Sequence, residues 1–320
     1  MDNIFENRNR LAHCWPAALR GVLCAFLLGV VSPMAFAAAA AQQGFASPQE
    51  GVSALVEAVR SDSQPMLHKI LGPHGSKLID SGDAVADERG RNAFIKAYDE
   101  ANRIVLKGDK QATLLVGRDE WPLPIVLVKS GRAWRFDTRQ GEKEILARRI
   151  GRNELAAIQV CLAIADAERE YVAQDPDGNG IAEYAKKFMS TAGKRDGLYW
   201  ETKPDEPLSP LGPLLATAAS EGYVRADSGT LAPYHGYFYK MLAAQGKDAA
   251  GGARDYIVKG RMLGGFAVIA YPARYGSSGV MSFIVNQDGV VYEKNLGANT
   301  AAIASRMTTY NPDASWKRPY

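Results

Sequence analysis

The feature that most constrains the fold is a long amphipathic segment at residues 141–173, in the middle of the chain. One stripe at helical spacing is apolar and consists of Leu155, Ile158, Leu162, Ala165 and Val172. Charged side chains lie largely off this stripe. A helix of this kind buries its apolar face against another layer, so we predict that it packs on a sheet formed by the second half of the chain.

The first half changes its hydrophobic period near Arg103. Ser47, Pro48 and Glu50 form a helix-start signal, with Ser47 as N-cap and Glu50 closing a capping box. Helices are also predicted over 65–71 and 87–102. After Arg103 the period becomes two, which predicts strands over 104–106, 112–116, 125–128 and 133–136. Three helices followed by an antiparallel meander are similar to the cone-like sheet of nuclear-transport-factor-like or cystatin-like folds.

The second half begins with the loop 175–180, for which we predict a following helix over 181–189 and a proline-rich connector over 204–213. Strands are predicted over 237–242, 257–259, 265–271, 280–285 and 290–293. Asp288-Gly289 joins the last two as a hairpin, because both residues tolerate positive φ.

The predicted fold class is therefore α+β, with N-terminal helices and a cone-like meander followed by a long helix on a second antiparallel sheet. The predicted organisation is a signal peptide (1–37), a leader (38–46), a helix-plus-meander domain (47–140), a helix-plus-sheet domain (141–309) and a C-terminal tail (310–320).

The first 37 residues have the three parts of an export signal. Arg8, Arg10 and Arg20 precede the apolar run 22–31, and Ala35-Phe36-Ala37 is a small-x-small cleavage site. The run is far shorter than the ~20 residues that span a bilayer. We therefore predict a periplasmic protein, with secretion as the alternative, that does not span the membrane after cleavage.

Charge argues against nucleic acid as a partner. The chain carries a formal charge of +3, and removal of residues 1–37 takes away three Arg and two acids. The basic residues Arg148, Arg149 and Arg152 are interleaved with Glu142, Glu144 and Glu154, which is typical of an ion-paired surface.

Cysteine gives little further information. Only Cys161 follows the predicted signal, so the mature chain has no internal disulfide. Cys161 shares an apolar helix face, which favours a small core residue over a nucleophile or an intermolecular bridge.

The loop from Asp175 to Gly180 is the candidate metal site. Asp175, Asp177 and Asn179 place oxygen ligands at alternate positions, Gly180 permits a sharp turn, and Glu183 falls at the ninth position. The twelfth position is Lys186 instead of the bidentate Glu that a calcium loop needs. The alternatives are a weak calcium site and a plain polar turn. No other cofactor is predicted.

Catalytic motifs are absent from the sequence: it contains no H-E-x-x-H, G-x-S-x-G, S-x-x-K, Walker or dinucleotide-binding pattern. His235 lies among Tyr234, Tyr237 and Tyr239, and an acid–base role there would need a carboxylate partner. The tail 310–320 is either a partner contact, a strap packed on the body or a frayed end.

Six sequence blocks carry a resemblance to a known family. They are Trp121–Ile125, Trp134–Thr138, Arg149–Glu154, Asp175–Gly180, Asp196–Trp200 and Tyr234–Tyr239. Residues 46–318 thereby resemble the bacterial family called domain of unknown function 2950. The resemblance implies an exported bacterial protein and carries no activity or site residues.

A second resemblance covers residues 152–295. The long helix, the Asp/Gly/Asn loop and the runs Phe266–Tyr271 and Ser282–Val291 look like the globular head of pilin-like proteins. In true pilins the leader runs straight into the assembly helix, whereas here about 100 residues intervene. The resemblance therefore implies a shared head architecture and not filament assembly.

Two functions remain open from the sequence. The first is a non-enzymatic envelope protein that binds a partner protein or a small ligand. The second is an envelope hydrolase whose Asp and Glu acid–base residues come together only in three dimensions. The absence of catalytic motifs favours the first.

Overall fold

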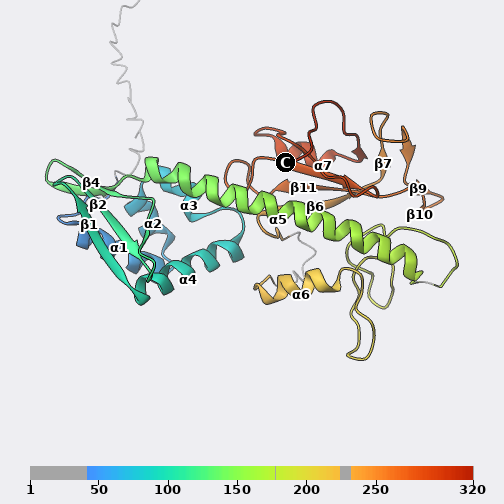
Figure 1. Ribbon diagram of the computed structural model, residues 1–320, viewed down its shortest axis with the longest axis horizontal. Helices are drawn as coiled ribbons and strands as arrows, with labels where there is room; N and C mark the ends of the chain where they lie inside the picture. Colours follow the sequence, from blue (N-terminus) through green and yellow to red (C-terminus); the bar gives the residue numbers. More distant parts are fainter. Residues whose placement is uncertain (1–41, 177, 224–231, 320) are drawn as a thin grey trace, which may run out of the picture. The chain divides into compact units, whose positions relative to one another are not determined.

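The computed structural model describes residues 42–176, 178–223 and 232–319, which belong to one compact unit (Figure 1). The predicted signal peptide and Asp177 lie outside the described residues. Within the described part of the chain, no helix is long and apolar enough to cross a bilayer.

The first half consists of helices followed by a small sheet. Its elements are α1 (Pro48–Arg60), α2 (Gln64–Leu71), the 3-10 turn η1 (Pro73–Gly75), α3 (Ser76–Ile79), α4 (Ala84–Glu100), β1 (Asn102–Lys107), β2 (Gln111–Val116), β3 (Trp121–Pro122), β4 (Leu127–Ser130) and β5 (Ala133–Phe136). The strands pair antiparallel in the order β1-β2-β4-β5, and β3 adds to β2.

The helix-start signal of α1 is confirmed. The Ser47 side chain accepts a hydrogen bond from Glu50 N, and Pro48 occupies the first turn. The reciprocal bond of the capping box is displaced by one residue, because the Glu50 carboxylate accepts from Ala46 N. Side chains of α1, α2 and the sheet form one apolar core that includes Val52, Leu114 and Phe136.

The long helix α5 runs from Thr138 to Gln174 and joins the two halves (Figure 1). The predicted stripe is wrong at Leu155, which is 68% exposed. The buried face instead follows the residues Ala157, Val160, Cys161, Ile164, Ala165, Glu168 and Tyr171. This face is selected by the sheet against which α5 packs, which includes β11 and β12.

The second half contains short helices around an antiparallel sheet. Its elements are α6 (Gly212–Ser220), β6 (Tyr237–Leu242), β7 (Ala244–Gln245), β8 (Arg254–Asp255), β9 (Ile257–Val258), β10 (Arg261–Met262), β11 (Ala267–Pro272), β12 (Ser282–Asn286), β13 (Tyr292–Lys294), α7 (Thr300–Arg306) and β14 (Thr309–Tyr310). The main sheet has the order β13-β12-β11-β6, and its central strands β11 and β12 are buried throughout. The predicted α+β class is confirmed.

The helix predicted over 181–189 is wrong. This segment is an extended loop in which Tyr184 pairs with Met262 and Ala185 N donates to the Glu168 side chain. Its backbone groups are therefore satisfied by α5 and by β10 instead of by one another.

The C-terminal tail is a strap on the body. Lys317 forms a β-bridge with Glu293, and Trp316 is only 7% exposed. Lys294 Nζ lies 5.7 Å from the centroid of the Trp316 ring. Of the three alternatives for the tail, a strap packed on the body therefore accounts for these residues.

Candidate functional site

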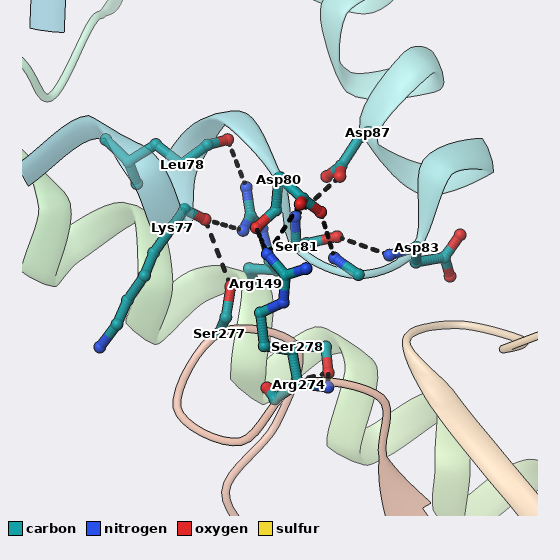
Figure 2. A network of polar contacts seen from close by, with 11 residues as sticks. Lys77, Leu78, Asp80, Ser81, Asp83, Asp87, Arg149, Arg274, Ser277 and Ser278 are labelled. Atoms are coloured by element: carbon teal, nitrogen blue, oxygen red, sulfur yellow. Dashed lines mark hydrogen bonds and ion pairs between the residues drawn. The ribbon is translucent and has the colours of Figure 1, made fainter. Parts of the chain in front are cut away.

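A polar network connects the first half to the second through α5 (Figure 2). Arg149 on α5 donates to the carbonyl oxygens of Lys77 (2.7 Å) and Leu78 (3.1 Å). These carbonyls lie in the short helix α3, so the guanidinium caps its C-terminal end. Burial lowers the pKa of Arg149, and the nearby carboxylates of Asp87 and Asp80 oppose that change.

The loop that follows β11 enters the same network. Arg274 NH1 lies 2.8 Å from Asp80 Oδ2 and donates to the Asp80 carbonyl at 3.0 Å. Ser277 Oγ donates to the Lys77 carbonyl (Figure 2). Burial opposes ionisation of Asp80, but the Gly82 N–H and the Arg274 guanidinium outweigh it and lower its pKa. The polar groups of the first half are paired with those of α5 and of the loop after β11. We therefore assign this network the structural role of joining the two halves.

The segment before β6 forms a tight turn at His235 and Gly236. Tyr234 and Tyr237 exchange both backbone hydrogen bonds, and the two residues between them have φ values of 50° and 75°. Two positive φ values in a two-residue loop are the pattern of a type I′ turn, in which Asn-Gly is the preferred sequence. Asn-Gly and not His-Gly is the preferred pair in such a turn, so turn formation alone does not explain the imidazole of His235.

The turn docks on Asp83, the N-cap residue of α4. The Asp83 carboxylate accepts from Gly236 N at 2.7 Å and from the Tyr223 hydroxyl at 2.9 Å. Gly236 is required here, since an added Cβ would lie 2.6 Å from Asn153 Nδ2. Asp83 is 1% exposed, so these bonds compensate a buried carboxylate.

The His235 imidazole has a carboxylate neighbour. Its Nε2 lies 3.3 Å from Glu221 Oε2, and both side chains are about three-quarters buried, at 25% and 22% exposed. Arg89 NH1 lies 3.4 Å from the same Glu221 oxygen. Burial lowers the pKa of His235, while Glu221 and Asp83 oppose the shift, so the ring is mainly neutral at neutral pH.

The predicted calcium ligands are held by protein groups. Asp175 ends α5 in the left-handed conformation (φ 44°), and its carboxylate accepts from Asn179 N and Gly180 N. The Asn179 side-chain oxygen accepts from Ile181 N. Glu183 faces Arg261, with distances of 2.6 and 3.0 Å. Arg261 is the main cause of the lowered pKa of Glu183.

Asp177, the remaining predicted ligand, lies outside the described residues. Among the described ones, no group of three or more His, Cys, Asp or Glu side chains is arranged to hold a metal ion. A weak calcium site and a plain polar turn therefore both stay predictions for this loop.

A pocket of about 430 Å³ lies between residues 190–195 and residues 199–201. Its lining combines two aromatic side chains, Tyr199 and Trp200, with the charged residues Lys194, Arg195 and Glu201. Trp200 packs edge-on against Tyr171 of α5, and the Arg195 guanidinium lies 5.4 Å from its ring centroid. The volume falls within the usual range of about 300–1,000 Å³ for small-molecule sites.

Cys161 is fully buried in the core of the second half. Burial raises the pKa of its thiol to about 12, so a thiolate nucleophile is not available at neutral pH. The interpretation of Cys161 as a core residue is confirmed.

The sequence missed two groups of residues that the fold brings together. Glu221 and Asp83 meet the His235 turn from distant parts of the chain, and no local pattern marks them. The pocket had a weak signal, since the block Asp196–Trp200 combines an acid, a glycine and two aromatic residues within five positions.

The fold and these sites define an α+β protein with a long central helix, a polar junction and a small aromatic and basic pocket. Residues 42–318 match the family model described as "Protein of unknown function (DUF2950)", so the chain belongs to this family. The predicted family is thereby confirmed. No curated protein and no solved structure matches the chain, and the resemblance to pilin heads is not confirmed.

Proposed function

We propose that this chain is an exported, soluble cell-envelope protein that acts as a ligand-binding module, without enzymatic activity at its binding site. The pocket at residues 190–201 is the single observation that carries the proposal. It combines a suitable volume with aromatic and polar side chains, which together orient small ligands. The periplasm is the proposed location, and secretion is the alternative.

Rigid support of the pocket favours binding. Asp196 accepts from Thr191 N at 2.7 Å, from Thr191 Oγ1 at 2.9 Å and from Lys187 Nζ at 2.9 Å. These bonds lower the pKa of Asp196 against the opposing effect of its burial. A pocket whose walls are fixed before binding loses less conformational entropy when a ligand arrives.

Binding is tested with ¹⁵N-labelled mature protein and soluble fragments of digested cell wall. Chemical-shift changes are expected to concentrate at residues 190–201 and to saturate with fragment concentration. Trp200→Leu should remove them, whereas Trp121→Leu, at a half-exposed indole outside the pocket, should not. Saturating shifts that are confined to another surface would refute this pocket as the site.

Export is tested separately by fractionation of cells and by N-terminal sequencing of the mature protein. The expected product begins at Ala38, after the site Ala35-Phe36-Ala37. Recovery of the full-length chain in the cytoplasm would refute export and leave the pocket proposal intact.

A second candidate function is hydrolysis at His235, favoured by the contact between its imidazole and Glu221. In this reaction, neutral His235 takes a proton from water, the resulting hydroxide attacks the substrate, and the proton passes to the leaving group. Glu221 stabilises the intermediate imidazolium. The left-handed backbone conformation of His235, uncommon for a residue other than glycine, is of the kind that clusters at functional sites.

His235→Asn separates catalysis from folding, because Asn-Gly is the preferred sequence for this turn. The variant should fold with unchanged or raised stability and lose any release of soluble fragments from purified cell-wall sacculi. Absence of release by the wild-type protein would refute this second function.

A further inference from the structure

We infer that the pocket at residues 190–201 recognises an acidic saccharide, with its anionic group near Lys194 and Arg195 and its sugar ring against the aromatic wall. This inference rests on the proposed binding function and adds the chemical class of the ligand. The carboxylate of such a ligand could be part of a free sugar or of a wall fragment, and the two share the same recognition chemistry.

The charges of the pocket favour an anion. Lys194 and Arg195 contribute two positive charges to the lining, and Glu201 contributes one negative charge. Among the described residues, no carboxylate lies within ion-pair distance of Lys194 Nζ. The carboxylate paired with Arg195 among the described residues is that of Glu206, at 3.6 Å, and the Arg195 side chain is 50% exposed.

The backbone of the pocket holds these cations in place. Lys194 N donates to the Thr191 carbonyl at 2.9 Å, which closes a turn with Gly193 at φ 73°. The Arg195 carbonyl accepts from the Tyr171 hydroxyl at 2.8 Å. Lys194 and Arg195 are thus fixed at their backbones, while their side chains remain accessible.

The aromatic wall favours a sugar over a simple inorganic anion. Tyr199 and Trp200 form part of the lining, and their flat aromatic rings offer an apolar surface for a sugar ring beside the Arg195 guanidinium, which lies 5.4 Å from the Trp200 ring centroid. Ser190 Oγ donates to Gly197 O at 3.1 Å and accepts from Gly197 N at 3.0 Å, so it supports the wall. A small inorganic ion would leave most of the pocket empty.

The test compares two sugars that differ in one acidic group. N-acetylmuramic acid carries a carboxylate on a lactyl ether, and N-acetylglucosamine has the same ring without it. In titrations of the ¹⁵N-labelled full mature protein, N-acetylmuramic acid is expected to bind at residues 190–201 at least 5-fold more tightly. Its affinity should fall when salt is added, because exposed charges are screened.

The outcomes separate the two levels of the proposal. Equal binding of both sugars at the pocket would overturn the acidic-ligand inference and leave the binding function standing. Binding of neither sugar, with shifts still produced by wall fragments, would also overturn the inference alone. Lack of any shift with sugars and fragments would overturn both.

Substitutions locate the anionic contact. Lys194→Gln should weaken binding of N-acetylmuramic acid about 5- to 10-fold and leave N-acetylglucosamine unchanged. Lys203→Gln, a lysine of the neighbouring loop that does not line the pocket, is the matched control. Equal losses for the two sugars on Lys194→Gln would refute a contact between this ammonium and the carboxylate.

Discussion

Replacement of Glu168 by glutamine is expected to remove a pH-dependent loss of stability from this protein. Glu168 lies on the buried face of α5 with none of its surface exposed. One carboxyl oxygen accepts from Ala185 N at 2.9 Å, and the other has no hydrogen-bond partner among the described residues. Burial raises the pKa of this carboxyl from 4.5 to about 8, although the Ala185 bond opposes the shift.

The direction of the effect follows from proton binding. In the unfolded chain the carboxyl loses its proton near pH 4.5, whereas the folded protein keeps it until about pH 8. Between these values the folded state binds more protons, so the free energy of unfolding falls as the pH rises. At about 1.36 kcal/mol per unit of pKa difference, a rise of roughly three pH units costs about 4 kcal/mol. This is a large part of the roughly 5–15 kcal/mol that stabilises a typical domain.

The assay is urea unfolding of the wild-type protein and Glu168→Gln at a series of pH values from about 5 to about 8.5. Other titrating groups cancel in the difference between the two curves, and the variant should gain relative stability as the pH rises. Glu170→Gln is the control, since Glu170 is exposed on the same helix and Gln can still accept from Gln174 Nε2. A difference between wild type and Glu168→Gln that is constant with pH would refute the reasoning.

Three further substitutions or treatments test other parts of the structure. Gly236→Ala should destabilise the protein by at least about 2 kcal/mol, measured by urea unfolding, since it adds a clash with Asn153 to an unfavourable positive φ; a neutral result would contradict the turn. Arg149→Gln should cost about 2–4 kcal/mol in the same assay, because two carbonyls of α3 lose a charged donor, whereas exposed Arg148→Gln should cost less than about 1 kcal/mol. Removal of calcium with EDTA should leave the thermal midpoint unchanged, because Arg261 holds Glu183; a fall that calcium alone restores would establish the ion.

Local sequence patterns predicted those elements whose contacts repeat with a fixed period. The long helix α5, the strand β6 and the hairpin between β12 and β13 were predicted close to their observed positions. The prediction of a helix over 181–189 failed. The apolar residues of this segment fit a helix, but Ala185 N donates to the Glu168 side chain and Tyr184 pairs with Met262. Both partners are remote in sequence, so no window over 181–189 contains the reason for its conformation.

The candidate sites were predicted less well than the fold. The bond from Gly236 to Asp83 spans 153 residues, and the sequence marks Asp83 only as a polar residue before a helix. His235 could be singled out for its aromatic neighbours, but its carboxylate partner Glu221 follows a helix that the sequence did not predict. A site whose residues come from distant parts of the chain cannot be recognised from a local sequence pattern and needs the folded structure.

The structure also separates residues that the fold needs from residues that it does not explain. In the block Arg149–Glu154, Arg149 caps α3, Asn153 donates to the Ser278 carbonyl, and Glu154 accepts from two backbone N–H groups at 280 and 281. The contacts through which these three side chains join α5 to the two halves explain why the fold needs them.

Lys194 and the His235 ring have no comparable structural explanation. The turn at 191–194 needs Gly193 but not the Lys194 ammonium, and the turn before β6 would form more easily with asparagine than with His235. Side chains in an uncommon backbone conformation, or exposed and outside the ion pairs of the described residues, are the ones at which we look first for function. For this reason the pocket and the His235 turn, and not the larger network around Arg149, are the places where substitution should alter function while the protein still folds.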